Sequence, residues 1–243
     1  MAARPDSRVS RPTLAEADIE RIRRERYQPR PTQWDYVHLD GLRRAIAETL
    51  PKLPITDGPV LDLYCGTQPY RELIPWRPVW GFDIDRHFGR ADVIGALPLP
   101  FADAAFSLVF CTQALHLTDD PAAVVREAAR VLSPGGYMAV TVPHIFRREI
   151  PAERKYSASQ LRQLFIGWRE MQLIGIGGVG TGLGFFPASI AGAAARHSSL
   201  VRRILPAVAL AMNGTSLALD TALGSLARRW PASFMLIARR PRS

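Results

Sequence analysis

Two acidic residues and a glycine mark the segment of this sequence best suited to chemistry. Asp62 lies within the apolar run Val60 to Tyr64, and Gly66 follows in a turn. Asp83 comes twenty-one residues after Asp62, in the stretch GFDID at the end of a second apolar run. A glycine after a strand lets a ligand approach the backbone, and an acidic residue after the next strand can accept two hydrogen bonds from a ribose. The spacing predicts a nucleoside site, although an aspartate at a strand end can also simply cap a turn.

The predicted site is unlike known phosphate sites. The sequence contains neither G-x-G-x-x-G, the pyrophosphate fingerprint, nor G-x-x-x-x-G-K-[ST], the P-loop. A nucleoside without phosphates therefore fits these residues better than a nucleotide.

An alternating series of strands and helices must position these residues. Apolar runs bounded by turn residues predict strands at 60–64, 79–83, 92–94, 107–111, 137–142 and 233–238. Helical spacing and capping residues predict helices at 36–50, from Pro121 to 132 after the cap Asp120, and after the capping box of Ser157 and Gln160. Residues 1 to about 30 are expected to be loosely held, apart from a short helix that Thr13 could cap and that would run to residue 24. Such alternation predicts a mostly parallel sheet covered on both faces.

Length, charge and cysteine content narrow the function classes. The chain has 243 residues with 47% apolar content, which fits one globular domain. Its net charge of +9 is concentrated at the two ends, since residues 196–243 hold eight arginines against one acid and residues 31–195 are nearly neutral. Nucleic-acid binding needs basic groups along the working surface, so no nucleic-acid partner is expected. Two cysteines and no export signal fit a cytoplasmic protein without a disulfide framework.

Four motifs in the order above resemble class I S-adenosylmethionine-dependent methyltransferases of the small-molecule kind, the methyltransferase type 11-like group. The resemblance runs from VLDLYCGTQPY through GFDID and LPLPFADAAFSLVFCTQALHL to VVREAARVLSPGGYMAVTVP, about residues 60–143. It implies a Rossmann-like α/β fold, with seven mostly parallel strands, helices on both faces, an antiparallel last strand and a helical insertion before that strand. It also implies S-adenosyl-L-methionine as the cofactor.

The resemblance assigns cofactor-binding roles to ten residues. They are Asp62, Tyr64, Cys65 and Gly66 for the methionine and ribose parts, Asp83 for the ribose, Ile84, Ala96 and Leu97 for adenine, and Cys111 and Gln113 beneath the sulfonium. The sequence departs from the family where glycine is usual, because Tyr64 and Gln68 stand there, and where an adenine-binding carboxylate is common, because Gly95 stands there. The tyrosine is expected to narrow the cofactor cleft.

Methyl transfer needs mainly a nucleophile aligned with the sulfonium, and a base only when the nucleophile is a hydroxyl. His116 and His144 both follow strands at the cofactor end of the sheet and are the candidate bases, although both could be ordinary hydrogen-bonded loop histidines. Tyr156 and Arg154 are candidates for the substrate pocket. No metal site is expected, because Asp119 and Asp120 alone do not supply enough carboxylates.

The segment before the last strand breaks the alternation of strands and helices. We divide the chain into an Arg/Pro-rich N-terminal extension (1–30) and a methyltransferase domain (31–243), with its core at 57–177 and 231–240 and a Gly/Ala-rich insertion at 178–230. The stretch Ile204 to Ala227 is long enough to span a bilayer, but Asn213 and Asp220 argue against a span. We favour helices packed over the sheet, as a lid or an oligomer face, over a helix lying on a membrane.

An apolar insertion predicts a small or lipid-like acceptor, such as a natural product or a glycolipid intermediate, methylated on oxygen. Two other readings stay open. The chain could be a catalytically silent relative that acts as a binding or scaffold protein, which the missing loop glycines suggest. It could also be a peripheral membrane module with weak membrane-surface contact through 196–230, because that segment is basic and apolar.

Overall fold

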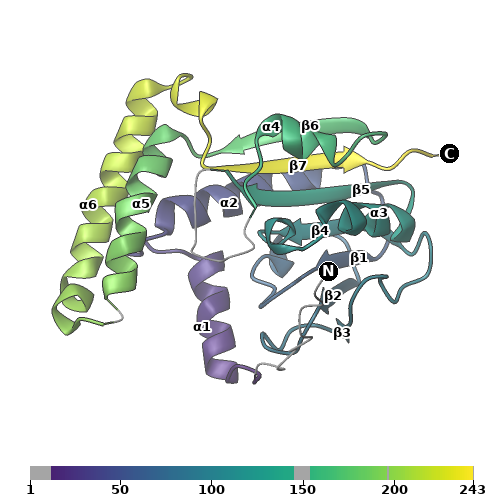
Figure 1. Ribbon diagram of the computed structural model, residues 1–243, viewed down its shortest axis with the longest axis horizontal. Coiled ribbons are helices and arrows are strands. Elements are labelled where there is room, and N and C mark those ends of the chain that lie inside the picture. The colour runs from purple at the N-terminus through teal and green to yellow at the C-terminus, as the bar shows by residue number, and fades with distance from the viewer. Residues whose placement is uncertain (1–11, 145–153, 196, 243) are drawn as a thin grey trace, which may run out of the picture.

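The computed structural model describes residues 12–144, 154–195 and 197–242, which form one seven-stranded sheet flanked by helices (Figure 1). The strands follow the order β3-β2-β1-β4-β5-β7-β6 across the sheet. Their bounds are β1 Val60–Leu63, β2 Val79–Asp83, β3 Val93–Ile94, β4 Phe106–Thr112, β5 Leu132–Pro143, β6 Arg169–Ile176 and β7 Ser233–Arg239. Strands β1 to β5 pair in parallel, whereas β7 is antiparallel to both β5 and β6. The expected Rossmann-like sheet with an antiparallel last strand is confirmed.

The strands that run through the middle of the sheet carry side chains to both of its faces. Successive residues of β1 show this, because Val60 packs on one face and Leu61 on the other. Such continuous apolar runs are typical of parallel strands buried on both sides. The sheet therefore has two separate cores, and each needs its own helical cover.

Helices cover the two faces unequally. Helix α2 (Tyr36–Thr49) covers one core with Leu42 and Ile46, while α3 (Pro121–Val131) and α4 (Ala158–Gln163) cover the other. The predicted caps are confirmed: the Asp120 carboxylate accepts from the Ala123 backbone N–H at 2.9 Å, and Ser157 forms a capping box with Gln160. These caps fix where α3 and α4 begin, and so where the loops before them end.

Helix α1 (Glu16–Tyr27) corrects two predictions about the N-terminal segment. Ala15, and not Thr13, occupies the N-cap position, and it makes no side-chain cap bond. The described part of this segment is not loosely held, because Ile19 is only 2% exposed and Arg90 pairs with both Glu16 and Glu20. Those contacts bind α1 to the loop between β2 and β3. The division of the chain into domains stays a prediction.

Helices α5 (Val179–Ala194) and α6 (Ser199–Leu223) form a hairpin that stands beside the sheet (Figure 1). The two helices pack mainly on each other, and both also contact α2. They fall between β6 and β7, so the chain leaves the sheet after β6, forms the hairpin and returns as β7. The hairpin thus reaches the sheet through α2 rather than by covering a face itself.

Candidate functional site

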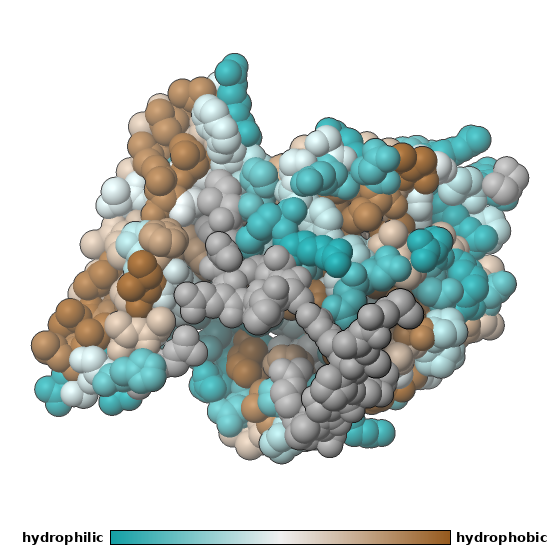
Figure 2. Space-filling view, in the orientation of Figure 1, coloured by the Kyte–Doolittle hydropathy of each residue, from teal (hydrophilic) through white to brown (hydrophobic). Residues whose placement is uncertain are grey.

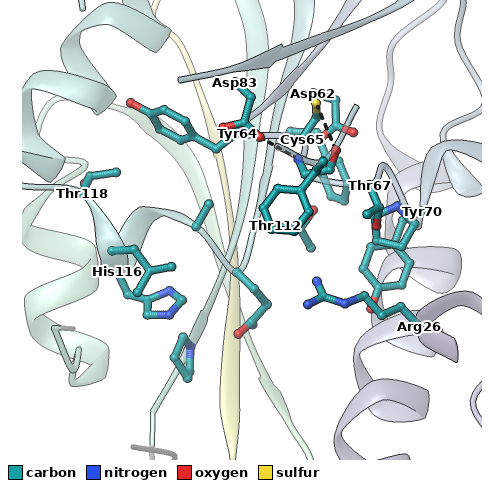
Figure 3. Close-up of a pocket in the computed structure, with 18 of the residues that line it drawn as sticks. Arg26, Asp62, Tyr64, Cys65, Thr67, Tyr70, Asp83, Thr112, His116 and Thr118 are labelled. Atoms are coloured by element: carbon teal, nitrogen blue, oxygen red, sulfur yellow. Dashed lines mark hydrogen bonds between the residues drawn. The ribbon is translucent and has the colours of Figure 1, made fainter. Parts of the chain in front are cut away.

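A cavity of about 610 Å³ lies at the carboxyl ends of β1, β2 and β4 (Figure 3). That volume falls within the roughly 300–1,000 Å³ typical of small-molecule sites. Its lining includes Asp62 in β1 and Tyr64, Cys65, Gly66 and Thr67 after it, Asp83 at the end of β2 and Ile84 after it, Thr112 at the end of β4 and Gln113 and His116 after it, and Ile22, Arg26, His38, Leu39 and Phe185 from helices. In open α/β sheets, ligands bind outside the carboxyl ends of the strands, which is where this cavity lies.

Asp83 ties the first two strand-end loops together. One of its carboxylate oxygens accepts a hydrogen bond from the Gly66 backbone N–H at 3.0 Å, and the other accepts from the Ile84 N–H at 2.8 Å. The residue is only 9% exposed and lines the cavity. A carboxylate offers about four lone-pair sites, so two backbone donors leave capacity for ligand hydroxyls. The residue predicted to accept from a ribose is therefore at the cavity and held rigidly by the backbone.

The loop after β1 has a left-handed backbone at three alternate residues. The φ angles are 57° at Tyr64, 55° at Gly66 and 49° at Gln68. Glycine adopts this conformation freely, whereas other residues pay about 1–2 kcal/mol each. The backbone at Tyr64 and Gln68 therefore has a conformation that glycine usually adopts, although both residues carry large side chains. This loop is locally strained.

The Tyr64 ring forms one wall of the cavity and leaves the rest of its volume open. Its ring packs against Phe82 with centroids 6.1 Å apart and planes tilted by 61°. Burial raises the pKa of the Tyr64 phenol to about 12, so its hydroxyl stays protonated at neutral pH. The side chain can therefore donate a hydrogen bond to a ligand beside it.

Gln68 turns away from the cavity and fills space behind the loop. The side chain is buried, and its Oε1 accepts from the Arg71 guanidinium at 2.9 Å. Its Nε2 has no hydrogen-bond partner among the described residues. A Cβ built on Gly81 of β2 would lie 2.4 Å from that nitrogen, so the two positions share one packing space.

Three buried titratable groups, Asp62, Cys65 and Cys111, lie in or beside the loop after β1. Burial, reinforced by the charge of Asp83, raises the pKa of the Asp62 carboxyl well above its usual range. Burial likewise raises the pKa of the Cys65 thiol, and it raises that of Cys111 to about 12. Because a thiolate rather than a thiol is the nucleophile, neither cysteine can attack a ligand at neutral pH. Cys111 is also absent from the cavity lining, unlike Cys65.

The loop after β4 brings Gln113 and His116 to the cavity. The Gln113 backbone N–H donates to the Thr141 hydroxyl at 3.0 Å, which ties the loop to β5. His116 lies on the 3-10 helix η3 (Leu115–Leu117) and is buried. Its backbone carbonyl accepts from the Arg154 N–H at 2.9 Å, so the segment before α4 braces this loop from outside. His116, one of the two predicted candidate bases, lines the cavity.

The structure does not bring His144 to the same place. The His144 Nδ1 lies 2.8 Å from the Tyr156 carbonyl, and its ring packs against Phe234 with centroids 4.8 Å apart. His144 does not line the cavity, because these two contacts turn its ring toward β7 and the segment before α4. Arg154 and Tyr156 line a separate hollow beside α3 and α4, so the structure does not bring these two predicted pocket residues to the cavity either.

The predicted adenine-side residues separate in the same way. Leu97 lines the cavity, and Ile84 does so with 59% of its surface exposed. Ala96 does not line it. A flat apolar ring bound in the cavity could cover the exposed Ile84 side chain, and the burial of that apolar surface would favour binding.

Helices outside the motif region supply residues that the sequence patterns did not reveal. Arg26 extends from α1 into the middle of the cavity (Figure 3). The rings of His38 on α2 and Phe185 on α5 pack edge to face there, with centroids 5.8 Å apart. The helical spacing of Ile19 and Ile22 was the one available sign that α1 packs inward. No cluster of three or more metal-ligating side chains occurs within residues 12–144, 154–195 and 197–242.

Comparisons with known proteins agree on the region that forms this cavity. Residues 61–140 match a family described as "Methyltransferase domain". A curated relative, 27-O-demethylrifamycin SV methyltransferase of Amycolatopsis mediterranei (strain S699), is 43% identical over 63 residues. That match covers 24% of this chain and 23% of the relative, so it concerns the shared domain and not the whole protein.

Solved structures share the fold at low sequence identity. The [4+2]-cyclase SpnF aligns with a TM-score of 0.56 and 22% identity, covering 86% of this chain and 83% of that one. A putative sarcosine dimethylglycine methyltransferase from Galdieria sulphuraria aligns with a TM-score of 0.55 and 18% identity, covering 83% and 86%. At these identities the likeness establishes the arrangement of the sheet and its helices, and the chemistry must be argued from the cavity.

Proposed function

We propose that this chain, which carries a class I S-adenosylmethionine-dependent methyltransferase domain, methylates an oxygen of an amphipathic, natural-product-like acceptor. One observation carries the proposal: Asp83 and Gly66 join at the carboxyl ends of neighbouring parallel strands, where they border a 610 Å³ cavity. An acidic side chain beside a glycine turn at this place suits an adenosine, and the cavity offers no phosphate-type loop.

The adenosine side of the cavity would be formed by residues after β2. Asp83 would accept the two ribose hydroxyls, since its carboxylate is already oriented by two backbone N–H groups. Ile84 and Leu97 would cover the adenine, because both line the cavity and Ile84 is exposed. These three residues supply recognition of a nucleoside without any charge for phosphate.

The methionine side would be formed by the loop after β1 and by α1. The Gly66 turn lets a ligand approach the backbone, and the protonated Tyr64 hydroxyl can donate to it. Arg26 points into the cavity from α1 and would pair with the carboxylate of the methionine part (Figure 3). The cofactor would thus be held by a carboxylate at one end and a guanidinium at the other.

S-adenosylmethionine supplies a methyl group on a sulfonium, a strong electrophile. The chain then needs mainly to hold the acceptor oxygen in line, at about 3–3.5 Å, and to exclude water. His116 would take the proton of an acceptor hydroxyl, because its ring is buried at the cavity wall on the loop after β4. Gln113, tied to β5 through Thr141, would fix that loop during transfer.

The acceptor side of the cavity is mostly apolar. Leu39 and Leu42 of α2 and Phe185 of α5 line it, with His38 between them. These walls suit a large acceptor with an apolar body and a polar reacting end. The partial match to a methyltransferase named for a 27-O-demethylrifamycin supports an oxygen acceptor of natural-product type.

A second candidate is a binding protein that holds the cofactor without methyl transfer. Tyr64 and Gln68 favour it, because they stand in left-handed positions where the methyltransferases that the sequence resembles usually carry glycine. The fold itself does not decide, since one structure that shares it is a [4+2]-cyclase.

Two measurements separate these candidates. Calorimetry with S-adenosylmethionine and S-adenosylhomocysteine tests binding, and cell extracts supplied with methyl-labelled cofactor test transfer to a product 14 Da heavier. Binding together with a labelled product supports the enzyme, and binding without any product in extracts of the source cells supports the second candidate. No saturable binding up to millimolar cofactor would refute both.

A further inference from the structure

The surface of the α5–α6 hairpin that faces away from α2 is apolar over nearly its whole length (Figure 2). We call it the outer face; its exposed large side chains are Leu183, Phe186 and Ile190 on α5 and Leu200, Ile204, Val208, Leu210 and Leu217 on α6. Phe186, for example, is 69% exposed. Soluble monomers rarely leave so long an apolar surface in water, so it marks an interaction site.

The two polar residues that argue against a membrane span, Asn213 and Asp220, turn away from this face. Asn213 Nδ2 donates to the backbone carbonyls of Pro31 at 2.8 Å and Gln33 at 2.7 Å. The Asp220 carboxylate accepts from the Gly180 backbone N–H at 2.7 Å and from the Thr181 hydroxyl at 2.6 Å. Asn213 therefore anchors α6 to the segment before α2, and Asp220 anchors α6 to the start of α5. The outer face is left without a charge between residues 204 and 227.

Three hydroxyl groups of the hairpin donate to the helix backbone rather than to water. Thr215 and Thr221 each donate to the carbonyl four residues earlier in α6, at 2.9 and 2.8 Å. Ser189 donates to a carbonyl three residues earlier in α5, at 2.7 Å. Such internal bonds let a helix carry hydroxyls into an apolar medium without desolvation cost. The outer face is thus prepared for hydrocarbon in composition and in hydrogen bonding.

Helix α6 has the length and composition of a membrane helix. The helix has 25 residues, and its most apolar stretch of 18 residues has a mean hydropathy of 1.2. Only 17% of that stretch is buried inside the protein. Asn213 joins one side of α6 to the segment before α2, and Asp220 joins it to α5, so lipid cannot surround the helix and α6 can only lie along a bilayer surface.

Basic residues stand at both ends of the outer face. Arg202 and Arg203 are exposed in the first turn of α6, and Arg228 and Arg229 are exposed just after it, next to the half-exposed Trp230. The two arginine pairs are separated by an apolar span of roughly 30 Å, at 1.5 Å per helical residue. Tryptophan and arginine at the edges of an apolar surface are typical of a membrane interface.

We propose that the outer face docks this protein on an anionic lipid bilayer, with the four arginines on lipid phosphates. Charge complementarity favours lipid over a second copy of the chain. A two-fold pairing of this face would place arginines against arginines in either orientation, and Asp220, the one acidic residue of 179–230, is turned inward. An anionic headgroup layer supplies the missing negative charge.

Membrane docking would set the catalytic cavity close to lipid. Phe185 lines the cavity, whereas its neighbour Phe186 lies on the outer face of the same helix. Only the width of helix α5 therefore separates the acceptor wall from the docking surface. An amphipathic acceptor dissolved in the bilayer would have a short path to the cavity, although the docking itself does not depend on methyl transfer.

Vesicle flotation of the full chain tests the proposal. We expect flotation with phosphatidylcholine vesicles that contain phosphatidylglycerol, weaker flotation with phosphatidylcholine alone, and release at high salt. R202Q/R203Q should weaken binding to the anionic vesicles roughly 30-fold, as expected when two arginines leave an anionic surface. The control R162Q/R169Q removes the same charge from exposed positions outside the hairpin and should bind as the wild type does.

The apolar contribution has its own matched pair. F186E should abolish flotation, whereas I166E, at a side chain that is also 69% exposed but outside the hairpin, should not. Unchanged thermal unfolding and unchanged S-adenosylhomocysteine binding show that the variants are folded, and they keep this test independent of the proposed activity. A wild-type chain that stays at the bottom with both vesicles would overturn the proposal. So would a dimer in light scattering that F186E dissociates and that does not float.

Discussion

Asp83 offers the sharpest test of the cavity, because its carboxylate has two separable roles. Asp83→Asn keeps the size of the side chain but removes its charge and one acceptor oxygen. In the structure both oxygens accept backbone N–H groups, of Gly66 at 3.0 Å and of Ile84 at 2.8 Å. The asparagine amide would therefore leave one of these donors without a partner, at a cost of about 1–3 kcal/mol. For a chain of this size, that lowers the Tm by about 2–12 °C.

The second effect concerns the ligand. A hydrogen bond to a charged acceptor contributes about 1.5–3 kcal/mol, so loss of the carboxylate should weaken S-adenosylhomocysteine binding roughly 10- to 150-fold. Calorimetry on the folded variant, well below its Tm, measures this directly.

Asp92→Asn is the matched control. The Asp92 carboxylate accepts from the backbone N–H of Gly81 on β2 at 2.7 Å, but it does not line the cavity. We expect this variant to lose a similar amount of stability and to keep its affinity for S-adenosylhomocysteine. If Asp83→Asn lowered the affinity no more than Asp92→Asn does, the nucleoside would not sit at the end of β2, and the site would be misassigned.

Three further predictions follow from the same region. The pKa of the Asp62 carboxyl is raised in the fold, so above about pH 4 the folded state holds this proton while the unfolded chain releases it, and the stability of the wild type falls as pH rises. Asp62→Asn does not titrate, so its unfolding free energy relative to wild type should increase between about pH 4 and pH 7. The same difference at both pH values in denaturant titrations would contradict this. Gln68→Gly should be about 1 kcal/mol more stable than Gln68→Ala, since the cost of φ 49° for alanine, about 1–2 kcal/mol, exceeds the roughly 0.4–1 kcal/mol that glycine loses through the entropy of the unfolded chain; equal denaturation midpoints would show that the loop relaxes. Once an acceptor is identified, His116→Asn should lower kcat about 10²- to 10⁴-fold, whereas His144→Asn should leave kcat nearly unchanged; the reverse pattern would exclude His116 as the base.

The sequence predicted the elements whose physical cause is local. Central strands such as β1 are short apolar runs between turn residues, and α3 begins at the aspartate–proline pair that caps it. Strand β6 was not located from its residues because it is an edge strand: its side chains are mostly exposed, so REMQLIGI shows no continuous apolar run. Its existence followed only from the resemblance.

The site was predictable in part for the same reason. Residues on the loops after β1 and β2 follow from strand ends and from one glycine. Arg26, His38 and Phe185 reach the cavity through the packing of helices far apart in the chain, which no local pattern encodes. His144 looked equivalent to His116 in sequence, but a carbonyl acceptor and the Phe234 ring turn it elsewhere.

The place of β7 in the sheet has a consequence for how the protein is made. β6 leaves the ribosome before β7, yet its position lies beyond β7, and β7 alone joins it to β5. Until residues 233–239 have emerged, β5 has an unpaired edge and β6 has no strand with which to pair. The apolar α5–α6 hairpin, which lies between β6 and β7 in the sequence, has already been synthesised by then. Nascent chains stopped before this strand should accordingly be targets for chaperones or protease, and capture of the last strand should be the step that commits the sheet to its final order.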